Sequence, residues 1–208
     1  MSSARSSRIL LATRSAGKIR ELRPLFEQAG LDLESLEDAG IAETADEETL
    51  ESAETFEANA LAKARHFQRL SGLPTVADDS GIAVAALRGA PGVFSKRWSG
   101  RADLSGQALD DANNALLLAR LESAGDRRAR YVCAAAYCAG DEEFVERGEV
   151  DGRITREPRG SGGFGYDPYF ESTELGRTFG EVSMEEKARV SHRARAFAKL
   201  LRHLGSRR

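Results

Sequence analysis

The chain has 208 residues and is 41% hydrophobic, a length that allows one well-buried core and is short for two. We therefore expect a single compact domain over residues 1–208, with residues 1–7 as a loose tail. The formal net charge of −3 argues against a dedicated nucleic-acid-binding protein, which normally carries a large basic excess. No segment approaches transmembrane length, so we expect no membrane association and a cytoplasmic location.

Lysine is rare in this chain. Of 30 basic residues only five are lysines, namely Lys18, Lys63, Lys96, Lys187 and Lys199. Because arginine is used almost everywhere else, these lysines merit separate inspection. A compact ammonium group acts on phosphate as a point charge, a role that the planar guanidinium does not replace freely.

The N-terminal part of the chain predicts a strand, a turn and a helix. Residues 9–13 have the character of a strand, and after the small-residue turn 14–17 an amphipathic helix follows, with Leu22 and Phe26 on one face. Unpaired N–H groups at such a helix start favour anions, so residues 13–18 form a candidate phosphate cradle. The segment is not a Walker A loop, and strand-turn-helix units also commonly bind nothing.

An acidic region comes next. From Pro24 to Ala62 there is no basic residue while twelve acids accumulate. A solvated acidic face explains most of them, although one or two could complete a magnesium site. A second helix predicted over 56–70 places Asn59 and Lys63 at i and i+4 on one face, a spacing at which a lysine is usually just solvated.

Two adjacent carboxylates, Asp78 and Asp79, follow an apolar strand that starts at Thr75. We expect the strand to end there in a turn. Successive strand side chains point to opposite faces, so the two aspartates should have different neighbours. One of them could hold magnesium, which takes carboxylate oxygens and completes its octahedron with water and phosphate. A polar turn capped by Asp and Ser is the alternative.

The middle of the chain has the pattern of a scaffold. Residues 110–121 predict a helix that carries the pair Asn113-Asn114. Strands are expected at 130–139 and 142–150, joined by a hairpin turn. The apolar run at 131–138 contains both cysteines, which have neither the spacing nor the histidine partners of a zinc site and are interpreted as buried, reduced thiols.

The segment Gly160–Phe170 combines four glycines with the interleaved aromatic residues Phe164, Tyr166 and Tyr169. Glycine allows a close approach to a ligand, and an exposed ring offers a face on which a base can stack. A rigid loop with its aromatics packed inward fits the pattern equally well. The last helical element begins at Ser183 with capping-box spacing and runs to about Leu204, with a possible break at Ser191. Its basic residues are either solvated or donate hydrogen bonds to a purine edge.

These pieces, in this order, resemble the inosine triphosphate pyrophosphatase family, the XTP/dITP diphosphatases. The matching segments, between Ile9 and about Leu204, are Ala12–Lys18, Thr55–Ala60 with Lys63, Ala77–Gly81 through Gly89–Gly92, Ser95–Arg97, Gly162–Pro168, and Glu186–Lys187 leading to Ser191–Arg193. The resemblance implies a mixed α/β fold, with a long curved central sheet, two lobes and a nucleotide cleft between them. It also implies hydrolysis of ITP, dITP and XTP to the nucleoside monophosphate and pyrophosphate, with Mg²⁺ as cofactor and a homodimeric assembly.

The family pattern further implies roles for single residues. The catalytic residues would be Asp79, Lys63 and Lys18. The substrate-binding residues would be Thr13, Arg14, Ser15, Ala16, Gly17, Lys18, Ser80, Phe164, Gly165, Tyr166, Asp167, Lys187, His192 and Arg193. Asp79 would ligate the metal and accept a proton, with Glu51 as second metal ligand, chosen by its spacing to Thr55, and Glu48 as the alternative.

The chain departs from the family pattern at three places. In the acidic stretch, Glu51–Ala53 lacks the glycine that usually follows shortly after the acidic metal ligand. Ser15 stands where asparagine is usual, and Ala58 where glutamate is usual. Substrate affinity or base preference could therefore shift, and the sequence does not rank ITP, dITP and XTP. Two other functions stay open: a purine-nucleotide sensor without turnover, and an enzyme of the same class that acts on standard or pyrimidine triphosphates.

Overall fold

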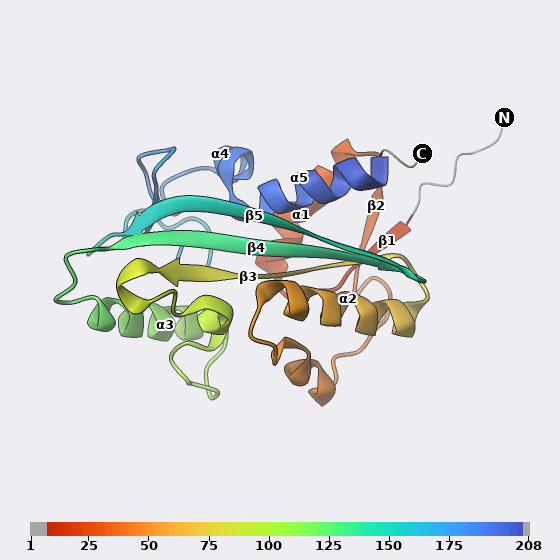
Figure 1. Cartoon of the computed structure of the whole chain (residues 1–208), viewed down its shortest axis with the longest axis horizontal. Helices are drawn as coiled ribbons and strands as arrows, with labels where there is room; N and C mark the ends of the chain where they lie inside the picture. The colour runs from red at the N-terminus through yellow and green to blue at the C-terminus, as the bar shows by residue number, and fades with distance from the viewer. Residues whose placement is uncertain (1–7, 206–208) are drawn as a thin grey trace. The chain divides into compact units, whose positions relative to one another are not determined.

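The chain folds as a mixed α/β protein (Figure 1), described by a computed structural model over residues 8–205 apart from the side chain of Glu48. The predicted tail, residues 1–7, lies outside this range. The strands are β1 (Arg8–Leu11), β2 (Asp32–Ser35), β3 (Thr75–Val84), β4 (Arg128–Ala139), β5 (Glu142–Ile154) and β6 (Phe170–Ser172). The α-helices are α1 (Ala16–Gln28), α2 (Phe56–Ser71), α3 (Gly106–Arg120), α4 (Met184–Val190) and α5 (His192–Gly205). The 3₁₀ helices are η1 (Ala45–Glu51), η2 (Ala85–Leu87) and η3 (Gly92–Arg97).

The six strands form one sheet in the order β2-β1-β3-β4-β5-β6. β1 pairs in parallel with both β2 and β3, whereas β5 and β6 are antiparallel. The predicted mixed α/β class with a long central sheet is confirmed. The long strands β3, β4 and β5 supply most of the sheet's length, with 10, 12 and 13 residues.

The described residues divide into two compact units, and the boundaries fall inside β3, β4, β5 and α5. The first unit contains residues 8–79, 134–147 and 194–205, and the second contains 80–133 and 148–193. The single-domain interpretation and the nucleotide cleft stay predictions.

In the first unit, α5 and α2 lie on opposite faces of the strands (Figure 1). Phe26 of α1 packs edge-on against Phe197 of α5, with ring centroids 5.9 Å apart, and both side chains are fully buried. The helix periodicity predicted for α1 therefore holds at Leu22 and Phe26.

In the second unit, α3 and α4 lie on opposite faces of the strands (Figure 1). Its core joins apolar side chains of β3, α3, β4, β5 and the segment after β5, among them Ile82, Leu117, Tyr131, Val150, Phe170 and Phe179. The aromatic part of this core contacts the glycine-rich segment directly, because Tyr166 belongs to the same cluster.

Several predicted elements are confirmed. The second helix begins at Phe56 as expected, β4 and β5 are joined by a two-residue turn at Gly140–Asp141, and the C-terminal element breaks at Ser191 between α4 and α5. The capping box at Ser183 is present, with the Ser183 hydroxyl accepting from the Glu186 N–H and the Glu186 carboxylate accepting from the Ser183 N–H. Cys133 and Cys138 are buried in β4, also as predicted.

One prediction is wrong: the strand does not end at Asp79 but continues to Val84. Asp-Ser-Gly is typical of a turn, yet here Gly81 lies within the strand because another segment approaches it closely. A Cβ atom on Gly81 would come within 2.3 Å of the Gly92 carbonyl oxygen and 2.4 Å of Ser95 Oγ. Gly81 thus allows close backbone packing rather than a reversal of the chain.

Within residues 8–205, no helix is both long enough and apolar enough to span a bilayer.

Candidate functional site

The first group of candidate residues lies in the first unit, where α1 begins beside β3. Ser15 caps α1, its hydroxyl accepting from the Lys18 N–H at 3.4 Å, so serine keeps a capping role that asparagine would also fill. The Lys18 ammonium lies 3.1 Å from the Asp78 carboxylate, which is fully buried. The helix start therefore brings a lysine against one of the two predicted aspartates.

Asp79 turns to the other side and contacts α2. Asn59 Nδ2 donates to Asp79 Oδ2 at 2.9 Å, while the same amide bonds both backbone groups of Ala53. The two adjacent aspartates thus contact different helices, as strand alternation predicts. Asn59 ties Asp79 to the segment before α2.

Lys63 is central to this group, and it is buried rather than solvated. It is 8% exposed, and its ammonium donates to Glu51 Oε1 at 2.5 Å and to the Asp78 carbonyl at 2.6 Å. Burial lowers the pKa of Lys63, but the nearby carboxylates of Glu51 and Asp79 outweigh burial and raise the pKa above its ordinary value. Lys63 is therefore a cation shared among three acidic groups.

For Asp79, burial has a larger effect on the pKa than the neighbouring charges do. It is 5% exposed, and its burial raises the pKa of the carboxyl. The charge of Glu51 raises it further, while Lys63, Lys18 and the hydrogen bond from Asn59 lower it without cancelling the burial. A carboxylate with a raised pKa is a stronger base than an ordinary aspartate.

Arg14, predicted to bind substrate, is instead engaged with the acidic segment. Its guanidinium donates to Glu47 Oε1 at 2.7 Å and Oε2 at 3.1 Å, and to the carbonyls of Ile41 and Ala42. The hydrogen bond from Arg14 lowers the pKa of Glu47. In this state Arg14 holds residues 41–47 near the start of α1.

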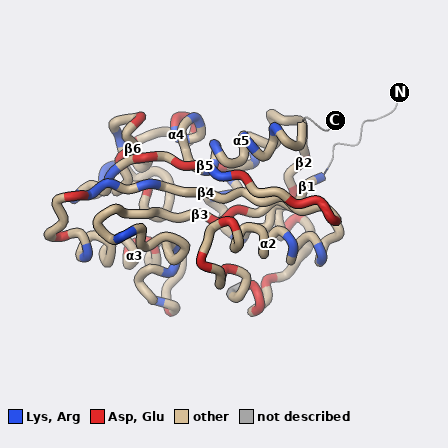
Figure 2. The backbone as a smooth tube through the Cα atoms, in the orientation of Figure 1, with Lys and Arg blue, Asp and Glu red and all other residues tan. Residues whose placement is uncertain are grey.

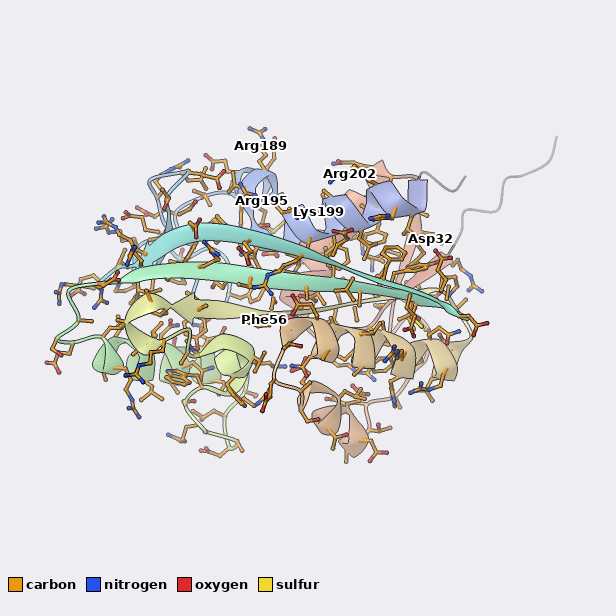
Figure 3. All side chains as sticks on the ribbon, viewed as in Figure 1. Asp32, Phe56, Arg189, Arg195, Lys199 and Arg202 are labelled. Carbon is orange, nitrogen blue, oxygen red and sulfur yellow. The ribbon has the colours of Figure 1, made fainter. Side chains whose placement is uncertain are left out.

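The acids that could hold a metal are Asp79 and Glu51, both in electrostatic contact with Lys63. No group of three or more His, Cys, Asp or Glu residues suited to a metal occurs among the described residues. Two carboxylates fit a hard cation such as magnesium, which draws its remaining ligands from water and phosphate, whereas they would not fit zinc. Glu48, the alternative ligand, has no described side chain. Figure 2 shows further acidic residues around η1 and the start of α2. Phe56, labelled in Figure 3, is the first residue of α2.

The second group of candidate residues lies in the second unit and centres on Asp167. Lys187 Nζ donates to Asp167 Oδ2 at 2.5 Å, and the Phe164 N–H donates to the same oxygen at 2.8 Å. The Tyr131 hydroxyl donates to Oδ1 at 3.4 Å. Gly163 makes room for this carboxylate, because a Cβ there would come within 2.1 Å of Asp167 Oδ2.

Cations flank the ring of Phe164. Lys187 Nζ lies 5.0 Å and the Arg193 guanidinium carbon 5.6 Å from the ring centroid. Arg193, which is 2% exposed, donates to Ser80 Oγ at 2.8 Å. His192 stacks on Tyr131, with ring centroids 4.5 Å apart and an interplanar angle of 5°. These basic residues are buried and structurally fixed, which decides against the solvated interpretation.

The aromatic residues of the glycine-rich segment differ in placement. Tyr166 is buried and its hydroxyl donates to the Ser95 carbonyl at 2.7 Å, so this ring packs inward. Burial raises the pKa of Tyr166 above its ordinary value. Phe164 is only half-buried. The inward-packed interpretation is confirmed for Tyr166, and stacking of a base on Phe164 stays a prediction.

Sequence reasoning missed two residues that hold this segment, Asp110 and Asn114 of α3. The Gly165 N–H donates to Asp110 Oδ2 at 2.8 Å, and Asn114 Nδ2 donates to the Gly165 carbonyl at 2.9 Å. The available signal was the polar pair Asn113-Asn114 just before the apolar face of a helix. Both asparagines are buried.

Residues 9–203 match the Ham1 family. A dITP/XTP pyrophosphatase of Mycolicibacterium paratuberculosis is 49% identical over 201 residues, covering 94% of each chain. A dITP/XTP pyrophosphatase of Burkholderia pseudomallei is 45% identical, covering 97% of this chain and 95% of its own. Among solved structures, the HAM1 protein from Coxiella burnetii superposes with a TM-score of 0.81 at 34% identity, covering 96% of this chain and 98% of its own.

Proposed function

Because the chain belongs to the Ham1 family, we propose that it hydrolyses non-standard purine nucleoside triphosphates (ITP, dITP and XTP) to the nucleoside monophosphate and pyrophosphate. Relatives named dITP/XTP pyrophosphatase match nearly the whole chain, which supports this substrate class over a sensor without turnover. The observation that carries the proposal is the buried Asp79 beside Lys63, with Lys18 on the adjacent Asp78.

We assign the triphosphate to the start of α1 and the two lysines. N–H groups at a helix start attract anions, and Thr13, Ser15, Ala16, Gly17 and Lys18 surround that start. Water would attack the α-phosphorus, with Asp79 orienting the water and accepting its proton. Negative charge then grows on the leaving pyrophosphate, where the ammonium groups of Lys18 and Lys63 stabilise it.

Asp79 and Glu51 would hold Mg²⁺. Their oxygens are the donors that this ion prefers, and an additional cation would offset the cost of ionising a buried Asp79 that also faces Glu51. When bound, the ion neutralises charge on the phosphate oxygens and polarises the phosphoryl group. Arg14 would contact phosphate only after exchanging its bonds to Glu47.

We assign the purine to the second group of residues. Phe164 offers a half-buried ring for stacking, and Gly165, Tyr166 and Asp167 shape the segment around it. Lys187, His192 and Arg193, with Ser80 as the hydrogen-bond partner of Arg193, would read the edge of the base.

Base selectivity would follow from hydrogen-bond donors at the six-position of the purine. Inosine and xanthine carry a keto oxygen there, which the guanidinium of Arg193 could bond. Adenine carries an amino group, which would leave that donor unpaired at a cost of about 1–3 kcal/mol. Guanine has the same keto oxygen, so its rejection requires a second contact near the two-position.

We further propose a homodimer that works in the cytoplasm on small nucleotides and binds neither nucleic acid nor membranes. The net charge of −3 supports the exclusion of nucleic acid.

The first experiment is an assay of purified protein with ITP, XTP, GTP and ATP, with and without Mg²⁺, in which pyrophosphate and orthophosphate are measured separately. We expect Mg²⁺-dependent pyrophosphate release that strongly favours ITP and XTP. Orthophosphate as the first product would place cleavage at another bond and contradict the mechanism. Nucleotide binding without either product would favour a sensor.

A further inference from the structure

The backbone of Gly165 is held at both its N–H and its carbonyl by one face of α3. Its N–H donates to Asp110 Oδ2 at 2.8 Å, and its carbonyl accepts from Asn114 Nδ2 at 2.9 Å. Asn114 Nδ2 also donates to the Asp110 carbonyl at 2.9 Å, one helical turn earlier. Asp110 and Asn114 therefore act as a pair on the two peptide groups that flank the Gly165 Cα.

We propose that Asp110 and Asn114 are positioning residues for base recognition, which fix the backbone of Gly165 and thereby the orientation of Phe164 and Asp167. The inference rests on the proposed function, because it deepens the assignment of the base to this segment. Neither residue needs to touch the nucleotide.

The segment needs such outside support because its own backbone is permissive. Gly163 and Gly165 both have positive φ, +77° and +63°, and a Cβ on Gly165 would meet nothing within 4 Å. A glycine in open space has no side-chain packing to restrict it, so ordering it costs more conformational entropy than ordering another residue. The two bonds from α3 supply the restriction that packing does not.

The neighbours of Gly165 turn this restriction into a defined geometry. On one side, Phe164 donates its N–H to Asp167 Oδ2, the oxygen that also accepts from Lys187. On the other side, the Tyr166 hydroxyl donates to the Ser95 carbonyl at 2.7 Å. Rotation about the Gly165 backbone bonds would change the positions of Phe164 and Tyr166 relative to each other, and with them the orientation of the Phe164 ring.

The region that receives Tyr166 is tied to the same helix. Asn113 Nδ2 donates to the Lys96 carbonyl at 2.9 Å, and Asn113 Oδ1 accepts from the Ser99 N–H at 2.7 Å. Consecutive asparagines of α3 thus hold the glycine-rich segment and the end of η3. What the sequence marks as scaffold is a shared anchor for two segments.

The carboxyl of Asp110 is partly buried. Burial raises the pKa of Asp110, and the negative charges of Asp111 and Asp167 raise it further. The hydrogen bond from the Gly165 N–H and the positive charge of Lys96 lower this pKa. The net pKa is raised, but an ionised Asp110 gives the Gly165 N–H a charge-assisted bond, stronger than a neutral one.

The decisive variants are Asp110→Ala, Asp110→Asn and Asp111→Ala. Asp111 is the matched control, an adjacent carboxylate of α3 that is exposed and accepts from Gln107 at 2.8 Å. Loss of one hydrogen bond that orders the base-binding segment should weaken binding of the substrate and of the transition state equally. Asp110→Ala should therefore raise KM for ITP about tenfold and leave kcat within about twofold. Asp110→Asn keeps an acceptor oxygen and should recover most of the loss, and Asp111→Ala should match the wild type.

Base selectivity gives a readout that a general loss of stability would not move. The ratio of kcat/KM for ITP to that for GTP should fall in Asp110→Ala and in Asn114→Ala, while the affinity for inorganic pyrophosphate stays within about twofold, because the phosphate residues are not involved. A lowered kcat at unchanged KM, or kinetics equal to wild type in Asp110→Ala, would overturn the inference.

A measurement without turnover separates this inference from the proposed function and covers the case in which Asp110→Ala does not fold. In NMR spectra of the wild type, the amide proton of Gly165 should shift as the Asp110 carboxyl titrates, and in Asp110→Asn this titration should disappear. A Gly165 amide insensitive to pH would refute the inference even if the enzyme released pyrophosphate. A titrating amide in a protein that releases none would refute the function alone.

Discussion

The two groups of candidate residues balance their charges in different ways. In the first unit, three carboxylates, of Asp78, Asp79 and Glu51, face the two ammonium groups of Lys18 and Lys63. In the second unit, the Asp167 carboxylate bonds Lys187, and the cations of Lys187 and Arg193 both lie over the ring of Phe164. The first group carries an excess of negative charge, whereas the second presents two cations to the ring of Phe164.

This difference indicates what each group lacks before substrate binds. A triphosphate brings more negative charge to the first group, so that group requires an added cation, consistent with the proposed Mg²⁺. The second group already has its cations, its aromatic face and its hydrogen bonds in place. It therefore needs rigidity, and the contacts from α3 supply it.

The largest effect should come from Asp79→Asn. This variant removes the proton acceptor and one proposed metal ligand, so kcat should fall about 10²–10⁴-fold. Asp32→Asn is the control, since Asp32 is an exposed carboxylate of β2 in the same unit (Figure 3). Pyrophosphate release at close to the wild-type rate in Asp79→Asn would end the catalytic assignment of the first group.

Lys63→Met should have the next largest effect. The variant keeps the length of the side chain but removes the cation that Glu51 and the Asp78 carbonyl share, so kcat should fall about 10²-fold through loss of charge stabilisation. Lys199→Met is the control, because Lys199 is exposed on α5 (Figure 3) and donates to the Arg147 carbonyl at 2.6 Å, outside the first group. A raised KM at full kcat would show that Lys63 binds phosphate without favouring the transition state.

Phe164→Ala tests the second group. Stacking on one base is worth about 1–3 kcal/mol, which corresponds to an increase in KM for ITP of about 5- to 150-fold with a small change in kcat. Phe94 offers a matched control, since it is 53% exposed and the guanidinium of Arg97 lies 5.0 Å from its ring centroid. Equal kinetics in Phe164→Ala and Phe94→Ala would contradict the assignment of the purine base to this segment.

The sequence predicted those parts of the fold whose local and tertiary signals agree. Residues 56–70 have helix periodicity and a capping threonine, and the structure places α2 at Phe56–Ser71 with the Thr55 hydroxyl accepting from Ala58. The extent of β3 could not be predicted, because what keeps Asp79 to Val84 extended is the close approach of Gly92 and Ser95 to Gly81, a tertiary contact.

The sequence indicated which residues are candidates for the site, but not which groups each of them contacts. Helix spacing alone would predict Lys63 to be a surface residue. Its burial is possible because acids outside its own helix, such as Glu51, pair with its ammonium group. Arg14 was predicted from its place in a motif, whereas its partner Glu47 belongs to the acidic region, which gave no sign of a specific contact. Asp110 and Asn114 were missed because their partner is a backbone peptide, which leaves no mark on residue type.

The smallest expected effect concerns stability, and it tests whether the first group is strained without a metal. Burial raises the pKa of Asp79, so the folded state binds the proton more tightly than the unfolded state does. The stability gained from that proton is present below the ordinary pKa of aspartate and is lost as pH rises through the raised value. In chelator at neutral pH, Asp79→Asn should therefore have a higher Tm than the wild type, and the difference should shrink as pH falls towards 4.

Adding Mg²⁺ should raise the Tm of the wild type more than that of the variant, because ions that bind only the folded state stabilise it. A variant less stable than the wild type in chelator would mean that Lys63 and Asn59 already compensate Asp79, and that the excess negative charge does not call for a metal.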